Sequence, residues 1–100
     1  MAKLITVYWR DIPAQVIAKA GRASAKVPLP ARFQVAIDRA AMRAGKGASD
    51  KYLDDWRRES GPCGSDLKAV AEAEAKRLDT AFPEVLLERM VKAGGRRPGD

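Results

Sequence analysis

Hydrophobic and polar residues alternate at the start of the chain in a way that predicts a β-hairpin. Lys3–Trp9 alternates Ile, Val and Trp with Thr and Tyr, and such β-branched and aromatic residues are typical of a strand. Ala14–Ala20 alternates again. Arg10–Pro13 between them has turn chemistry, because Asp can bond nearby backbone and Pro cannot continue a ladder. We expect a loop longer than the tight two-residue type, which leaves the register open.

Helical periodicity follows a connecting stretch, Gly21–Pro30. Each proline near its end keeps the preceding residue extended. Ala31–Ala44 then carries apolar residues at i, i+3 and i+4 spacing and is followed by Gly45, which predicts a helix packed against the hairpin. The apolar face of this helix consists of Phe33, Ala36, Ile37, Ala40, Ala41 and Ala44.

The next segment fits two kinds of element. After a loop at Lys46–Asp50, the aromatic and leucine side chains of Lys51–Ser60 fit either one face of a helix or one side of a strand. We favour a third strand, because a lone hairpin is only marginally stable. Gly61–Gly64 predicts a break in the chain.

Two helices are expected after this break. Ser65 is a suitable cap for a helix over Asp66–Ala81, and Pro83 begins a last helix over Glu84–Ala93. The elements together predict an α+β domain, a small antiparallel sheet covered by two to three helices, with a single domain over residues 1–94 and a frayed tail over 95–100. We expect these residues to be mostly buried: Ile5, Val7, Trp9, Val16, Phe33, Ile37, Leu67, Leu78 and Leu86.

Composition excludes several chemistries. The chain of 100 residues has no histidine and one cysteine, so Ser-His-Asp and Cys-His mechanisms, an internal disulfide and a cysteine-based metal cluster cannot form within it. We expect no enzymatic activity, no cofactor and no metal. No apolar stretch approaches the roughly 18 residues of a membrane span, and the first residues lack a signal-peptide pattern, so a cytoplasmic location is expected.

Positive charge is concentrated in the first half of the chain. Residues 1–50 hold nine Lys/Arg against three Asp/Glu, whereas residues 51–100 hold ten of each, so the whole net charge of +6 belongs to the first half. Such asymmetry indicates an anionic partner, or else a solvated basic surface that keeps the protein soluble.

One candidate site is a basic stripe on the helix Ala31–Ala44. At about 100° per residue, the cations of this stripe lie within roughly 60° of one another, and Lys19, Arg22 and Lys26 precede them and extend the patch. The stripe suits an acidic protein or a phosphate backbone, or it is only the solvated side of the helix. Its members are Arg32, Arg39, Arg43 and Lys46.

A second candidate is Glu74, which falls near the middle of the apolar face of the helix Asp66–Ala81. A carboxylate there is costly unless it is paired or hydrogen-bonded. It is either a ligand anchor with a raised pKa or a group neutralised by a partner. We expect that partner to be an Arg, a Lys or a backbone N–H from residues 1–50.

The hairpin turn and the cysteine each have one functional and one structural interpretation. Arg10 and Asp11 follow an aromatic pair at the hairpin turn, which indicates either a recognition surface or core aromatics beside a structural turn. Cys63 precedes a helix start, where the helix dipole lowers a thiol pKa. Without a second Cys or a His, an ordinary loop cysteine is favoured.

The segments YWRDIPAQVIAKAGR, FQVAIDRAAMRAG and YLDDWR resemble the bacterial family described as "virulence factor", a domain also found in conserved virulence factor C proteins. The resemblance covers roughly residues 3–60, and its most specific part is YWRDIP–QV. It implies an effect on pathogenicity in some members and no particular chemistry. It also implies an accessory subunit of folate- and corrinoid-dependent one-carbon metabolism, since stand-alone members sit among genes for that chemistry.

Two functional hypotheses follow. The first is a non-enzymatic accessory or interaction protein that binds an acidic protein partner through its basic first half. The alternative is a nucleic-acid-binding protein that uses the same half, although no helix-turn-helix and no aromatic stacking strip accompany the charge. An enzyme that uses Glu74 or the Arg10–Asp11 pair is the third class.

Overall fold

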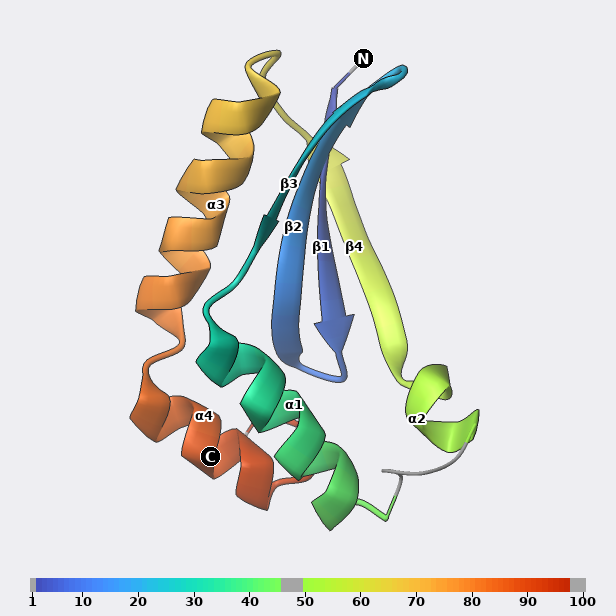
Figure 1. Cartoon of the computed structure of the whole chain (residues 1–100), viewed down its shortest axis with the longest axis vertical. Coiled ribbons are helices and arrows are strands. Elements are labelled where there is room, and N and C mark those ends of the chain that lie inside the picture. Colours follow the sequence, from blue (N-terminus) through green and yellow to red (C-terminus); the bar gives the residue numbers. More distant parts are fainter. Residues whose placement is uncertain (1, 46–49, 98–100) are drawn as a thin grey trace.

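Four strands form one antiparallel sheet in the computed structural model, which describes residues 2–45 and 50–97 (Figure 1). They are β1 (Lys3–Trp9), β2 (Ile12–Ala20), β3 (Ala23–Pro28) and β4 (Trp56–Pro62), in the spatial order β3-β2-β1-β4. The two strands richest in β-branched residues, β1 and β2, lie at the centre, where both edges of a strand are paired. The expected α+β fold is confirmed.

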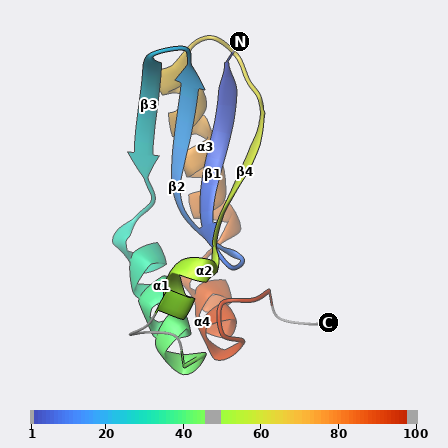
Figure 2. The same cartoon turned by 90° about the vertical axis from the view of Figure 1, so that its right-hand side faces the viewer.

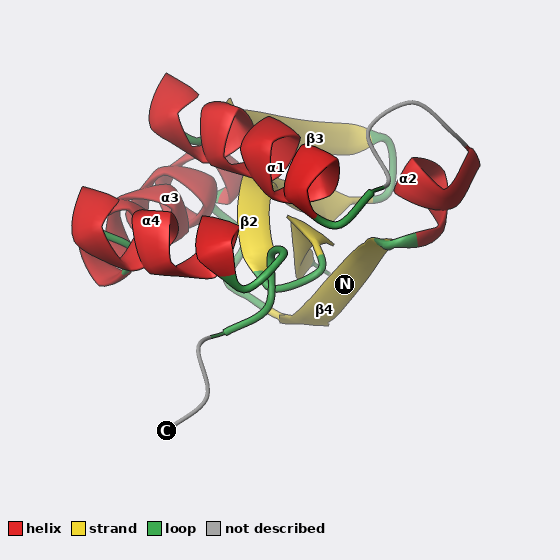
Figure 3. Ribbon diagram, turned by 90° about the horizontal axis from the view of Figure 1, so that it is seen from below, coloured by secondary structure: helices red, strands yellow, loops and turns green. Residues whose placement is uncertain are grey.

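The helices leave one face of this sheet open. α3 (Leu67–Ala81) packs along β2 and β3, whereas α1 (Ala31–Arg43) and α4 (Glu84–Lys92) pack on each other at one end of the sheet (Figures 1 and 3). Figure 2 looks onto the opposite face, where the short helix α2 (Asp50–Asp54) lies near one end and the strands are otherwise uncovered.

The main core lies between α3 and the sheet and continues between α1 and α4. Trp9, Ile12, Ile37 and Met90 have no exposed surface, and Phe33 meets Phe82 edge to face with ring centroids 6.1 Å apart. The expected core is confirmed as buried, apart from two residues that are only partly buried, Leu67 and Leu86.

The hairpin turn is shorter than we expected. Trp9 pairs with Ile12, so the turn has only two central residues, and Arg10 adopts the left-handed region with φ 54°. Val7 pairs with Gln15 and Tyr8 with Pro13, which leaves Ala14 as an extra residue in β2. Pro13 has no N–H for the ladder, and a bulge is one of the few places where a strand tolerates it. The predicted loop was therefore wrong because Pro13 belongs to the strand.

The stretch Gly21–Pro30, expected to be only a connection, contains β3. This strand pairs with β2 from Ala20↔Ala23 to Gln15↔Pro28. It is an edge strand built largely from Ala, Ser and Lys, which lack the β-branched signature of a central strand. Pro28 stands at its end, where a missing donor costs no ladder bond.

The ambiguous segment contains both kinds of element. Asp50–Asp54 forms α2, and β4 follows and pairs with β1 from Trp9↔Trp56 to Lys3↔Pro62. The expected strand is confirmed, but it begins later than Lys51 and runs through part of the predicted break. Residues 46–49 of the expected loop lie outside the described residues.

Two predictions about chain ends need correction. The cap of α3 is Asp66 rather than Ser65, and its carboxylate accepts a bond from the Ala69 N–H at 3.2 Å. Residues 95–97 are not frayed as expected. Gly95 is buried, and its carbonyl accepts a hydrogen bond from the Asp11 N–H at 2.9 Å. Residues 98–100 lie outside the described residues.

Candidate functional site

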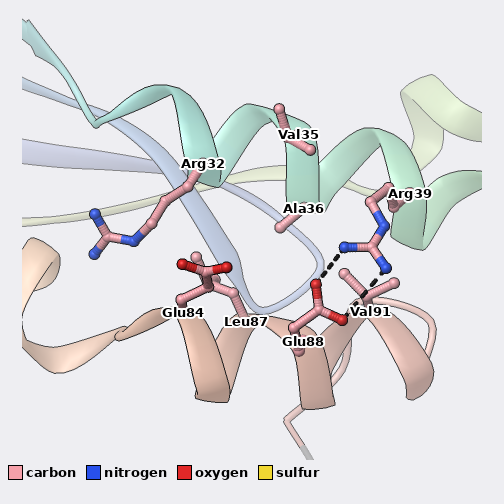
Figure 4. Close-up of a pocket in the computed structure, with 8 residues that line it drawn as sticks. All are labelled: Arg32, Val35, Ala36, Arg39, Glu84, Leu87, Glu88 and Val91. Carbon is pink, nitrogen blue, oxygen red and sulfur yellow. Dashed lines mark hydrogen bonds and ion pairs between the residues drawn. The ribbon is translucent and has the colours of Figure 1, made fainter.

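The arginines of the predicted stripe on α1 reach partners on α3 and α4, although Arg39 and Arg43 are also exposed to solvent. Figure 4 shows Arg32 and Arg39 beside α4. Arg32 forms an ion pair with Asp79 at 2.6 Å, and its guanidinium also donates to the carbonyl oxygens of Asp79 at 2.8 Å and Phe82 at 3.0 Å. These carbonyls belong to the end of α3, where backbone acceptors lack helical partners. Arg32 therefore ties the start of α1 to the end of α3.

The next arginine of the stripe is also paired. Arg39 binds both carboxylate oxygens of Glu88 on α4 (Figure 4). This bidentate contact lowers the pKa of Glu88 and raises that of Arg39, because it stabilises both charged forms. Arg43 donates from Nε to the Lys92 carbonyl at 3.1 Å, and Lys46 lies outside the described residues.

A groove of about 230 Å³ lies between α1 and α4. Its floor is apolar and includes Ala36, Leu87 and Val91, while Arg32 and Arg39 stand at its two ends (Figure 4). Since both guanidiniums already have partners, the stripe links helices within the molecule. That the stripe binds a ligand stays a prediction. Such a ligand would have to bind Arg32 and Arg39 alongside their partners Asp79 and Glu88.

The Arg10 side chain holds the end of the hairpin against two other segments. Its Nε lies 3.3 Å from a carboxylate oxygen of Asp55, its Nη1 donates to the Gly94 carbonyl at 2.8 Å, and its guanidinium lies 5.1 Å from the centre of the Trp9 ring. Only 13% of this side chain is exposed. These contacts favour the structural interpretation of the turn.

Asp11 completes the same junction. One carboxylate oxygen lies 3.3 Å from Arg57 Nη2, and the other accepts from the Arg97 N–H at 2.7 Å. Arg57 also donates from Nε to the Arg10 carbonyl at 2.9 Å. Asp11 thus connects the turn to β4 and to the segment after α4, and its role as a recognition residue stays a prediction.

The partner of Glu74 is on its own helix, so the expected partner from residues 1–50 was wrong. Arg77 donates to both carboxylate oxygens, at 2.7 and 2.5 Å, and this contact raises the pKa of Arg77. The Glu74 side chain is 18% exposed and that of Arg77 is 62% exposed. One helical turn separates the pair, which lets the arginine reach the carboxylate from the water side.

A different set of cations occupies the open face of the sheet. We call the exposed side chains of Lys3, Lys19, Arg22, Lys26 and Arg58 the basic sheet face. Lys19, Arg22, Lys26 and Arg58 line a shallow hollow of about 470 Å³ together with Ile5 and Ile17. Within the described part of the chain, none of the five forms an ion pair.

The strand register explains why these residues share one face. Lys26, Ile17, Ile5 and Ser60 stand in one row across the four strands, and Val7 stands opposite Arg58 in the next row. Ile5, Val7 and Ile17 form a small cluster there with 6–8% of their surface exposed. The neighbouring long side chains thus present mainly charge over a small apolar centre.

Carboxylates are kept off this face. β1, β2 and β3 contain no Asp or Glu, and the Glu of β4, Glu59, stands opposite Thr6 on the side that faces α3. Spacing along the sequence predicts Lys19, Arg22 and Lys26 as an extension of the helical stripe and gives no indication of Lys3 or Arg58. Arg58 belongs to this face because β4 pairs with β1, which sets Arg58 beside Val7. No local sequence pattern indicates this pairing.

Comparison with known proteins identifies the family. Residues 7–91 match the model of the family described as "virulence factor". The chain belongs to this family. A search of curated proteins and a search of solved structures gave no match. The match runs past the region of the noted resemblance and includes α3 and most of α4.

The thiol, the possible metal ligands and the helix lengths of this virulence-factor domain give three further findings. Cys63 is half-buried with a free thiol, and its backbone N–H donates to the Ala2 carbonyl at 3.3 Å. Among residues 2–45 and 50–97, no group of three His, Cys, Asp or Glu side chains is placed to hold a metal ion. None of the helices described is both long enough and apolar enough to cross a bilayer.

Proposed function

We propose that this virulence-factor domain is a non-enzymatic interaction protein that binds an acidic protein partner on the open face of its sheet. The observation that supports this most strongly is the basic sheet face, where five exposed cations have no carboxylate partner among the described residues. The clustered positive charges repel one another. Binding of an acidic partner is favoured both because its negative charges attract these cations and because they reduce the repulsion among them.

The same face favours a charge-driven contact over a hydrophobic one. Ile5, Val7 and Ile17 together leave little apolar surface to bury, since each is less than one-tenth exposed. Affinity then comes mainly from Lys and Arg, and rising salt weakens it because exposed charges are screened. A partner with Asp and Glu around a small apolar patch matches this arrangement.

An acidic protein fits the described side chains better than a nucleic acid. Sheets that bind single-stranded nucleic acids stack bases on exposed aromatic rings. The aromatic residues at the end of this sheet are engaged with one another: Trp9 donates from Nε1 to the Tyr52 carbonyl at 2.8 Å, and Tyr52 meets Trp56 edge to face at 5.9 Å. The expected link to one-carbon metabolism stays a prediction.

The test compares two double charge reversals. Lys19→Glu with Lys26→Glu changes the basic sheet face, and Lys68→Glu with Lys76→Glu places the same change on exposed positions of α3. Each tagged variant and the wild-type chain are used to capture partners from native cells, with and without nuclease treatment. Captured proteins are identified and purified, and the affinity of each for the three chains is measured at two salt concentrations.

The proposal predicts an acidic protein that binds the wild-type chain and the α3 control equally, binds the sheet variant at least tenfold more weakly, and loses affinity as salt rises. Equal affinity for the sheet variant would contradict it. Loss of all capture on nuclease treatment would indicate a nucleic acid partner instead. Unchanged far-UV circular dichroism shows that the variants remain folded.

A further inference from the structure

A second concave surface lies on the other side of the sheet, away from the basic sheet face. It is a recess of about 290 Å³ between β1, β4, the end of α3 and the segment after α4. Three arginines from three separate segments line it, Arg57 from β4, Arg77 from α3 and Arg97 after α4. Groups so far apart in sequence meet here only because the C-terminal segment returns to the hairpin turn.

Aromatic rings form two walls of this recess. The Arg57 guanidinium lies 4.5 Å from the centre of the Tyr8 ring, and that of Arg97 lies 5.3 Å from the centre of the Phe82 ring. Such stacking fixes the orientation of the guanidinium over the ring. The N–H groups at the edge of the guanidinium remain free to donate hydrogen bonds. Leu78 and Ala81 add apolar surface beside Phe82.

Two of the three arginines are already occupied. Arg57 binds Asp11 and Glu59, and Arg77 binds Glu74. The Arg97 guanidinium has no ion pair or hydrogen bond among the described residues, although its backbone N–H is anchored on Asp11. The Tyr8 hydroxyl likewise makes no hydrogen bond with a described residue. Among the described residues, the recess therefore offers one unpaired guanidinium and one unpaired hydroxyl. Beside them lies a small apolar surface, in which Ala81 is exposed while Leu78 and Phe82 are 2% and 5% exposed.

We propose that this recess binds a small monocarboxylate with an apolar body, whose carboxylate meets Arg97 and the Tyr8 hydroxyl while its body lies against Ala81 and the small exposed part of Phe82. The charges favour one negative charge over two, because Arg97 is the one lining guanidinium without a carboxylate partner among the described residues, whereas Arg57 and Arg77 already meet Asp11, Glu59 and Glu74. A dianion would be repelled by Asp11 and Glu59. At about 30 Å³ per water-sized group, the volume has room for about ten such groups.

The test follows binding of 3-phenylpropionate by amide chemical shifts, with the neutral 3-phenylpropanamide and the dianionic phenyl phosphate as comparisons. We expect 3-phenylpropionate to shift the amides of Tyr8, Leu78 and Phe82 and to bind more tightly than either comparison compound. Arg97→Gln should weaken it at least about tenfold, since a charge-assisted bond is lost. Tyr8→Phe should weaken it by about tenfold, since a hydrogen bond from the hydroxyl to the charged carboxylate is lost.

The matched control is Arg96→Gln, which removes the same charge from the adjacent exposed position outside the recess. It should leave the affinity unchanged. The proposal is overturned if 3-phenylpropionate leaves the recess amides unshifted at millimolar concentration, if the amide or phenyl phosphate binds as tightly, or if Arg97→Gln has no larger effect than Arg96→Gln. Dispersed amide spectra show that each variant is folded, and none of the changes alters the basic sheet face.

Discussion

Gly95 lies directly against the indole of Trp9. A Cβ at Gly95 would come within 2.6 Å of Trp9 Cζ3, and the backbone of Gly95 has a φ of +94° that side chains rarely adopt. Its N–H donates to the Met90 carbonyl at 2.8 Å, and its carbonyl accepts from Asp11. The segment after α4 is thus held tightly over the buried indole by contacts that only glycine permits.

This contact predicts that Gly95→Ala destabilises the domain. Overpacking against Trp9 and a left-handed backbone together should lower the free energy of unfolding by at least about 2 kcal/mol. Gly21→Ala is the control, because Gly21 also has positive φ but no atom lies within 4 Å of its Cβ position. It should cost only about 1 kcal/mol. Urea unfolding measures both, and equal losses would contradict the close packing.

Glu74→Gln should be tolerated. Its partner Arg77 is mostly exposed, so the arginine remains hydrated when the carboxylate is removed. We expect the free energy of unfolding to fall by less than about 1 kcal/mol, as for other surface pairs. A loss of about 3 kcal/mol or more in urea unfolding would show instead that a buried cation had been left without its partner.

The pair of Arg39 and Glu88 predicts a titration with a definite sign. The Arg39 guanidinium holds the pKa of Glu88 below its ordinary value of 4.5. The folded state therefore binds this proton less readily than the unfolded state, so the pair stabilises the fold above the ordinary pKa. That contribution is lost as the pH falls through the lowered pKa of the folded state.

Carboxyl ¹³C shifts measure the titration. Arg39→Gln should return the pKa of Glu88 toward 4.5, because Arg39 is the largest cause of its lowering. Lys92→Gln is the control and should raise this pKa less, since Lys92 acts on Glu88 only through space. An unchanged pKa in Arg39→Gln would mean that the two side chains do not meet in solution.

Sequence patterns predicted those elements whose side chains carry a strong signal. The helix at Ala31 was predictable because its apolar spacing and Gly45 agree, and β1 because it is rich in β-branched residues. β3 was not, because Ala23 and Ala25 fit a strand or a loop equally. Helical spacing placed Arg32 and Arg39 on one side of α1, but it gave no information on α3 and α4, which supply Asp79 and Glu88 as their partners.

The two candidate surfaces were harder to predict from the sequence than the helices and strands, because they are formed by residues far apart in the chain. Arg58 joins Lys26 on one face only through the register of β4 with β1 and of β2 with β3. Arg97 and Tyr8 line the same recess only because the chain after α4 folds back over Trp9. Neither relationship has a local sequence signal, since each joins segments about 30 to 90 residues apart.

The central claim, that the open sheet face binds an acidic protein, is tested most directly by mapping the contact on the ¹⁵N-labelled domain. The captured partner is added unlabelled, and amide shifts or line broadening are followed residue by residue. We predict that the affected amides cluster at Ile5, Ile17 and Lys26 and in β4 around Arg58, and that α1 and α4 are unchanged. Changes confined to the groove between α1 and α4, with the open sheet face unaffected, would contradict the account.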